Sequence, residues 1–517
     1  MNLNQETQSG GKDPGSENMH IVRTILFGGL LFLVLLNIIL NEMRFYLPEG
    51  NYQGFERWVG LILLIAALMY AGVSILTDSG HAKSVRALCR RMCTREQIAL
   101  TAIFVWFVID CLIYQSMGVE ACFQKNDYPL YLTGLSALVF FPLAEYVGSR
   151  KARPVIEGII HIVVISYTIY SAWCLWHYLQ MDYVVFPSGK QLAISVNGSL
   201  SMGNNRNIVG TAAGVMFSLC LYMIVTQTRF VKVLYGLQLL VNLAVLLLSN
   251  CRSGLVGVIA VLVSTTWIVC WKKLPIKKTL YRVGICALLS LSCIVLLRAS
   301  QKLLFQYLNH KLVTAQTVSE ETNGQGTYEE ERATSQTTET VAKNSAIKER
   351  DLTSAGSNGR SRIWRMALQI IYYNPRTFWI GVTPGQLRQY FKEVGNLSKG
   401  PYHTHNLYLQ IATTLGVPAL MVFIFFLLSL AIRCVRIIRF EDARMFEGAW
   451  FVPIILLYLL IVDLVEPMLF VSRSVNQPFF YMLAGWIVEE VEYGGRTFGL
   501  KGLFSVMIKH SRLFSIH

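Results

Sequence analysis

The feature that most constrains this chain is a succession of apolar runs of about 20 residues, each separated from the next by a connector. A helix of that length crosses the hydrocarbon core of a bilayer, and its backbone satisfies its own hydrogen bonds there. Only 15% of the residues are charged, whereas a soluble protein carries about 25%. The sequence therefore predicts an all-α polytopic membrane protein. We expect about twelve transmembrane helices, centred near Leu31, Ala67, Phe107, Ala137, Ser166, Phe217, Leu240, Val261, Leu288, Val417, Leu457 and Ala484.

Basic residues concentrate in alternate connectors, at residues 83–95, 150–153, 229–232, 272–278 and 433–444. The intervening connectors hold few cations. Since lysine and arginine accumulate on the cytoplasmic side of membrane proteins, this alternation predicts that both termini are cytoplasmic. The net charge of +15 follows from the same bias, so it does not indicate a nucleic-acid partner.

One predicted outer connector is much longer than the others and separates spans nine and ten. We divide the chain into a cytoplasmic tail (1–20), spans one to nine (21–298), this extracytoplasmic loop (299–404), spans ten to twelve (405–491) and a second cytoplasmic tail (492–517). Residues 314–357 are rich in Ser, Thr, Glu and Gln and almost lack aromatic residues. Such a composition predicts disorder. Residues 358–404 differ, since they hold basic groups and a histidine with apolar residues close by, and we expect them to be the catalytic part of the loop.

The catalytic part opens with a helical pattern over residues 362–373. An apolar stripe at helical spacing predicts an amphipathic helix, which we expect on the outer membrane face. Asn374-Pro375 is typical of a helix end. The stripe consists of Ile363, Trp364, Ala367, Ile370 and Ile371.

Three arginines fall on predicted outer segments: Arg252 in a tight turn between spans seven and eight, and Arg360 and Arg362 just before the amphipathic helix. The planar guanidinium donates two hydrogen bonds at once, which suits a lipid diphosphate. The structural alternative for Arg252 is a side chain that extends to the membrane interface. For Arg360 and Arg362 the alternative is a solvated helix start.

His405 lies where the long loop enters span ten, and a neutral imidazole there is a candidate general base. The alternative is a structural histidine at the interface. His403 and His405 have a spacing that permits chelation, but no carboxylate or thiolate is near in sequence, so we expect neither a metal nor another cofactor. The eleven cysteines lie mostly in apolar runs without paired spacing, which predicts no disulfide framework.

Three acidic residues fall within or beside predicted spans. Asp110 lies deep in span three, and Asp463 and Glu466 lie near the outer end of span eleven. An acid within a membrane is a functional hypothesis by default. For Asp463 and Glu466 the alternative is a simple interfacial position, whereas Asp110 is expected to face an arginine across a shared cavity.

Three stretches together resemble a known family. They are Gly203–Asn207, Ser249–Gly254, and the block from Gly359 through Asn374-Pro375 to the His405-Asn406-Leu407-Tyr408-Leu409 sequence and Gly416. With the long loop between spans nine and ten, the chain resembles the O-antigen ligase-like superfamily of membrane glycosyltransferases. That superfamily includes O-antigen ligases, polysaccharide polymerases and some protein O-oligosaccharyltransferases.

The resemblance implies an inverting, metal-independent transfer of a glycan from undecaprenyl diphosphate to an acceptor hydroxyl of a glycan, lipid or protein. The reaction would occur on the outer face of the bacterial cytoplasmic membrane, in cell-surface polysaccharide biosynthesis. His405 matches the family's base-like histidine, and Arg252 and Arg360 match its two diphosphate-contacting arginines. Arg206 stands where family members often have proline. The residues expected to bind substrate are Arg362, His403, Arg206, Asn406 and Asp110.

The residues do not separate a ligase from a polymerase. A transporter or flippase of lipid-linked glycans is the alternative from another class, and it predicts inverted repeats and helices broken at the midplane. An extracytoplasmic sensor or scaffold would not need arginines and a histidine at the membrane face.

Overall fold

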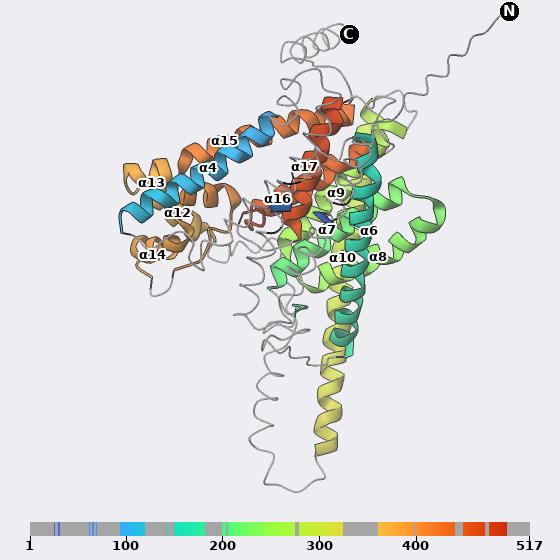
Figure 1. Ribbon diagram of the computed structural model, residues 1–517. Helices are drawn as coiled ribbons and strands as arrows, with labels where there is room; N and C mark the ends of the chain where they lie inside the picture. Colours follow the sequence, from blue (N-terminus) through green and yellow to red (C-terminus); the bar gives the residue numbers. More distant parts are fainter. Residues whose placement is uncertain are drawn as a thin grey trace, which may run out of the picture.

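The computed structural model describes residues 94–118, 149–180, 199–202, 205–273, 279–323, 360–397, 400–439, 448–470 and 475–493, with single positions before residue 142. Within these ranges the long regular elements are all helical (Figure 1). The helices are α4 (Arg95–Ser116), α6 (Ser149–Gln180), α7 (Arg206–Thr226), α8 (Arg229–Leu248), α9 (Arg252–Lys273), α10 (Thr279–Asn323), α12 (Arg360–Ile371), α13 (Pro375–Ile380), α14 (Pro384–Gly395), α15 (Leu407–Arg439), the short 3₁₀ helix η1 (Ala449–Phe451), α16 (Val452–Asp463) and α17 (Asn476–Tyr493).

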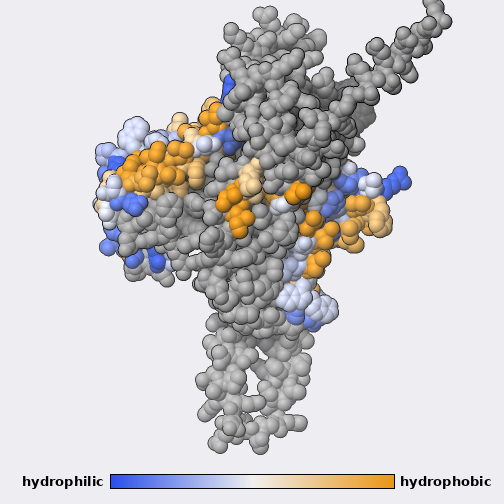
Figure 2. All heavy atoms as spheres, viewed as in Figure 1, coloured by the Kyte–Doolittle hydropathy of each residue, from blue (hydrophilic) through white to orange (hydrophobic). Residues whose placement is uncertain are grey.

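Seven of the described helices are long and apolar enough to cross a membrane: α4, α6, α7, α8, α9, α10 and α15. Their exposed side chains are largely apolar, and Figure 2 shows orange side chains over the arm formed by α4 and α15. Because an exposed apolar surface of this extent suits lipid rather than water, these helices make the protein a multi-pass membrane protein.

The expected twelve spans are confirmed only in part. The predicted spans near Leu31, Ala67 and Ala137 lie outside the described residues. Those near Leu457 and Ala484 correspond to α16 and α17, and neither qualifies as a span in this structure. The apolar stretch that contains α16 covers only Ala449–Asp463, and the last turns of α17 carry several glutamates. The position of the long loop between spans nine and ten is likewise not confirmed.

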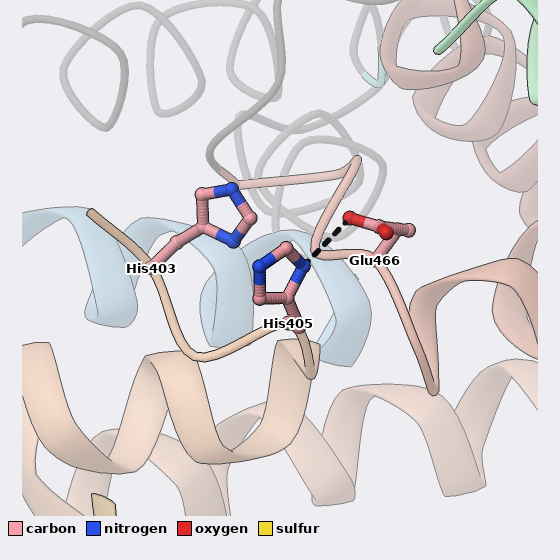
Figure 3. Close-up of side chains that lie close together, drawn as sticks. All are labelled: His403, His405 and Glu466. Atoms are coloured by element: carbon pink, nitrogen blue, oxygen red, sulfur yellow. Dashed lines mark hydrogen bonds and ion pairs between the residues drawn. The ribbon is translucent and has the colours of Figure 1, made fainter. Parts of the chain in front are cut away.

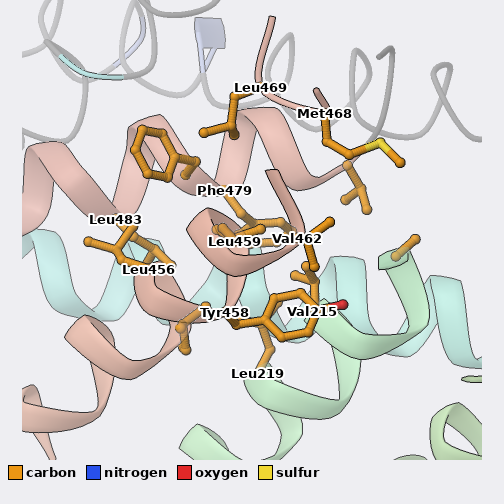
Figure 4. Close-up of a cluster of buried hydrophobic side chains, with 14 of the residues drawn as sticks. Val215, Leu219, Leu456, Tyr458, Leu459, Val462, Met468, Leu469, Phe479 and Leu483 are labelled. Atoms are coloured by element: carbon orange, nitrogen blue, oxygen red, sulfur yellow. The ribbon is translucent and has the colours of Figure 1, made fainter. Parts of the chain in front are cut away.

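The centre of the molecule is built on close contact between α7, α9 and α16. Tyr458 of α16 lies near Val215 and Leu219 of α7 (Figure 4). Its hydroxyl donates to the carbonyl of Thr211 over 2.7 Å. A Cβ added at Gly214 would lie 2.1 Å from the Tyr458 hydroxyl, and one at Gly257 2.6 Å from its ring. Small residues let membrane helices approach in this way, and the packing fixes the first turns of α7 and α9 beside the end of α16.

Helices α12, α13 and α14 form a separate small unit with its own apolar core. The amphipathic helix predicted from residue 362 onward is α12, but its apolar face does not lie on lipid. Ala367, Ile370 and Ile371 are buried. Ala367 and Ile370 pack with Leu387 and Phe391 of α14, and Leu409 of α15 packs against the same cluster. Asn374 ends this region as expected, and its side chain also caps α13 through the backbone amide of Thr377.

This unit is attached at a kink in α15. Gly416 has φ +82° inside the helix and Pro418 follows it, so the carbonyl of Leu415 is released and accepts from the indole of Trp106 over 2.9 Å. A Cβ at Gly416 would lie 2.2 Å from the carbonyl oxygen of Trp379 in α13. The kink therefore holds α13 against α15 and fixes α12 relative to the residues that precede α15.

Helix α10 is the longest element and projects from the body of the molecule (Figure 1). Its 45 residues give a length of about 68 Å, against a hydrocarbon core of about 30 Å. The helix continues to Asn323, so it extends into the segment 314–357, for which the composition predicts disorder. Extending an existing helix adds a hydrogen bond per residue without a new nucleus, which favours such a continuation. The rest of the predicted insert lies outside the described residues.

Candidate active site

A buried carboxylate, Glu466, gathers three side chains from distant parts of the chain. His405 Nδ1 lies 3.1 Å from Oε2 (Figure 3). Asn207 Nδ2 donates to Oε1 over 2.8 Å, and the Arg360 guanidinium forms an ion pair with the same oxygen. We call these four residues the Glu466 cluster. The chain thus brings His405 and Arg360, both singled out from sequence, to one carboxylate.

Glu466 is presented by a turn that follows the end of α16. Its backbone amide donates to the carbonyl of Val462 over 3.0 Å. The carboxylate of Asp463, buried at the last residue of α16, accepts from the amides of Met468 and Leu469 over 2.6 and 3.2 Å. Asp463 therefore closes the turn, and Glu466 points into the cluster with its side chain 6% exposed.

His405 is held in an uncommon backbone conformation. Its φ is +54°, a left-handed value that costs energy for a residue with a Cβ and is common at functional sites. Asn406 accounts for part of this geometry: its side-chain oxygen accepts from the amide of Leu409, and its Nδ2 donates to the carbonyl of Leu464, both over 2.9 Å. Asn406, which the resemblance places among the substrate-binding residues, caps α15 and joins it to the turn that carries Glu466.

The two N-terminal arginines of α12 point to different places. Arg360 contacts Glu466, whereas Arg362 is exposed and its Nη2 lies 3.4 Å from the carbonyl of Gly395, the last residue of α14. A helix spacing of two residues puts side chains on different faces. Of the two, only Arg360 joins the cluster.

The other two motif stretches lie beside the cluster. The thiol of Cys251 is 3.5 Å from the carbonyl of Asn207, and burial raises its pKa. Asn250 has φ +54°, which turns the chain sharply so that the half-buried Arg252 begins α9 next to this contact. Arg206 begins α7, with its Nη1 3.4 Å from the hydroxyl of Ser199.

His403 contacts His405 edge to face, with ring centroids 4.1 Å apart. Burial, followed by the charge of His405, lowers the pKa of His403 to about 4, although Glu466 acts in the opposite direction. Its Nδ1 is buried and has no hydrogen-bond partner among the described residues. His403 is therefore a neutral imidazole at physiological pH.

Asp110 is fully buried in α4 but belongs to a different neighbourhood. It lies one turn before Tyr114, whose hydroxyl donates to the carbonyl of Gly381 over 2.6 Å. The Arg376 guanidinium is 4.9 Å from the Tyr114 ring. The contacts of Glu466 within the described part of the chain do not include Asp110.

His403, His405 and Glu466 also place one candidate ligand atom each within 4.8 Å of one another. The expectation of no metal rested on the absence of a nearby carboxylate in the sequence, and the fold supplies one. The donor set nevertheless fits a divalent cation poorly, because Arg360 and Asn207 already bond the carboxylate. An arginine at that distance would repel a second positive charge.

The cluster includes two residues that were not among the site residues expected from sequence, Asn207 and Glu466. Glu466 was considered only as an acid within or beside a span. It is 61 positions from His405 and 106 from Arg360, so no local spacing joins them. The available signal was an acid at the end of an apolar helix, next to Asp463.

The apolar helices and a polar cluster at their ends define a multi-pass membrane protein with a charged, half-buried site. Residues 237–424 match the family model of O-antigen ligases, which confirms the resemblance to the O-antigen ligase-like superfamily. The match covers just over a third of the 517 residues and supports a ligase- or polymerase-type role in polysaccharide biosynthesis. It includes Arg252, Arg360 and His405 and ends before Glu466. No curated protein matches the chain.

Proposed function

We propose that this protein is an inverting membrane glycosyltransferase that moves a glycan from undecaprenyl diphosphate to an acceptor hydroxyl, as a ligase or a polymerase. The observation that carries the proposal is the meeting of His405 and Arg360 on Glu466. The family match over residues 237–424 supports the same class of reaction.

In this proposal His405 removes the proton of the acceptor hydroxyl while its oxygen attacks the anomeric carbon. The bond from that carbon to the diphosphate breaks, and the lipid diphosphate leaves with the electron pair. A general base of this kind contributes about 10²–10⁴-fold to a rate. Because the diphosphate is a good leaving group, no covalent enzyme intermediate is required.

Arg360 and Arg252 would stabilise the charge that develops on the departing diphosphate, so the proposed reaction needs no metal. A guanidinium donates two parallel hydrogen bonds to phosphate oxygens. Fixed charges act most strongly where water is largely excluded. Here the side chains of Arg360 and His405 are 21% and 29% exposed, whereas that of Glu466 is 6% exposed. A substrate can therefore reach the two proposed reactive groups.

The alternating basic connectors favour a site on the outer face of the bacterial cytoplasmic membrane, with both termini in the cytoplasm. There the donor's lipid tail stays in the bilayer while its diphosphate reaches the cluster. An acceptor glycan, lipid or protein approaches from the aqueous side.

The test is to reconstitute the purified protein in liposomes with an undecaprenyl-diphosphate glycan and to identify the products by mass spectrometry. A longer lipid-linked glycan indicates a polymerase, and a glycan on a terminal acceptor indicates a ligase. The same liposomes report whether the donor moves between leaflets. Movement without any covalent product would overturn the proposal in favour of a transporter.

A further inference from the structure

We propose that Glu466 is the positioning residue for His405. It fixes the proton of the imidazole on Nδ1, so that Nε2 is the atom that receives the proton of the acceptor hydroxyl. This inference rests on the proposed function and adds to it a residue outside the family match.

The first step is the ionisation of Glu466. Burial raises the pKa of this carboxyl, but the hydrogen bond from His405 and the nearby positive charge, of which that of Arg360 is permanent, outweigh it and lower the pKa below its ordinary value. An ionised carboxylate only accepts hydrogen bonds. In the contact of 3.1 Å between His405 Nδ1 and Glu466 Oε2, the proton must therefore be on the imidazole.

The second step concerns the opposite ring nitrogen. A neutral imidazole carries one proton, so a proton on Nδ1 leaves a lone pair on Nε2. When Nε2 takes the acceptor's proton, His405 becomes a positively charged imidazolium next to the negatively charged Glu466 carboxylate. The carboxylate stabilises this cation, and no proton moves onto Glu466, because Arg360 keeps the carboxylate charged.

The third step is rigidity, because a tautomer is useful only when the ring is held in place. Asn406 joins the backbone beside His405 to Leu464, and Asp463 closes the turn that carries Glu466. Asn207 binds the remaining carboxylate oxygen over 2.8 Å. These hydrogen bonds hold the His405 imidazole and the Glu466 carboxylate in a fixed position relative to one another.

The alternative is that Glu466 only stabilises the fold by neutralising Arg360. The two roles predict different kinetics. A fold-stabilising residue affects every variant equally, whereas a residue that acts through His405 loses its effect when His405 is absent.

The experiment compares Glu466→Gln with Glu393→Gln, which removes an exposed carboxylate of α14. Glutamine keeps the shape of the side chain but can donate to Nδ1, which favours the opposite tautomer. We expect turnover to fall by about 10–100-fold, part of the contribution of an acid–base group. Donor binding should be no weaker, since Arg360 loses a competing anion, and the Glu393→Gln variant should behave like the wild type.

The decisive arm repeats Glu466→Gln in a His405→Ala background. We expect no further loss of turnover there. If Glu466→Gln does not fold, Glu466→Asp tests the same point, because its shorter side chain cannot reach His405 and Arg360 together. We then expect reduced turnover with unchanged donor binding.

Undiminished turnover of a folded Glu466 variant, or losses that multiply in the double variant, would overturn this inference and leave the proposed function standing. A wild-type protein that forms no product from any lipid-linked glycan would remove both.

Discussion

At the scale of single residues, His405 and Arg360 touch the same carboxylate, yet their substitutions should have different effects. His405 presents a ring that exchanges a proton, whereas Arg360 carries a permanent charge. Kinetic measurements that separate donor binding from turnover distinguish the two roles.

His405→Ala should slow glycan transfer by about 10²–10⁴-fold while donor binding and folding are retained. The neighbouring variant His403→Ala should lose less, because among the described residues the histidine that bonds Glu466 is His405, and His403 contacts His405 only through its ring. Transfer and donor binding are measured on the same purified samples. An active His405→Ala enzyme would remove the proposed base.

Arg360→Ala should weaken donor binding, transition-state stabilisation or both, and Arg360→Lys should recover little because lysine lacks the planar fork. Arg362→Ala is the matched control on the same helix. Its side chain contacts Gly395 rather than Glu466, so its loss should be smaller. Equal effects of the two alanine variants would argue against a specific role of Arg360.

The buried imidazole of His403 should make stability depend on pH. Its pKa is lowered from 6.5 to about 4, so between these values the unfolded chain binds a proton that the folded chain does not. Stability therefore falls as the pH drops from 6.5 towards 4, by up to about 1 kcal/mol per pH unit from this group. Thermal unfolding in detergent at pH 7 and pH 5 should show a smaller shift for His403→Gln than for the wild type. An identical shift would contradict this account.

The site residues differ in how far the sequence could reveal them. His405 and Arg360 stand in recognisable local motifs. Glu466 does not, because its role arises from contacts across 61 and 106 positions. Nothing in the sequence indicated that the side chain of Asn406 satisfies backbone groups at the start of α15.

At the scale of elements, the kink of α15 determines whether α12 can reach Glu466, in the turn after α16, and Asn207, in the first turn of α7. The periodicity of apolar residues predicted that α12 is an amphipathic helix. It does not indicate whether lipid or another helix covers the apolar face. The partner, α14, follows in the chain after the short helix α13 and covers the apolar face of α12 with Leu387 and Phe391. Similarly, the sequence predicted spans at α16 and α17 from their apolar runs. The acidic residues beside these runs shorten the apolar segment that can enter a bilayer.

Gly416→Ala should destabilise the protein. The backbone conformation alone costs about 1–2 kcal/mol with a Cβ, and the new atom would collide with the carbonyl of Trp379. Gly236→Ala in α8 is the control, because nothing lies within 4 Å of its added Cβ, and alanine favours a helix by about 0.5–1 kcal/mol. Melting temperatures should move in opposite directions. A tolerated Gly416→Ala would show that the kink is not required.

At the scale of the whole molecule, α10 provides a direct test of orientation, since its two ends lie on opposite sides of the membrane. In a cysteine-free background, an impermeant thiol reagent should label a cysteine at Asn323 in intact cells, and one at Thr279 only after permeabilisation. The expectation follows from the basic connector at residues 272–278. The reverse labelling pattern would put the Glu466 cluster on the cytoplasmic side.

The length of α10 also sets a requirement on chain reach. A helix of about 68 Å that spends about 30 Å in the bilayer ends nearly 40 Å away from it. The connection from residue 324 to 359 must recover that distance before Arg360 can meet Glu466. Fully extended, it covers about 120 Å, roughly three times what is needed. Since about a dozen residues would already cover that distance, we expect variants shortened within residues 324–359 to keep Arg360 at Glu466.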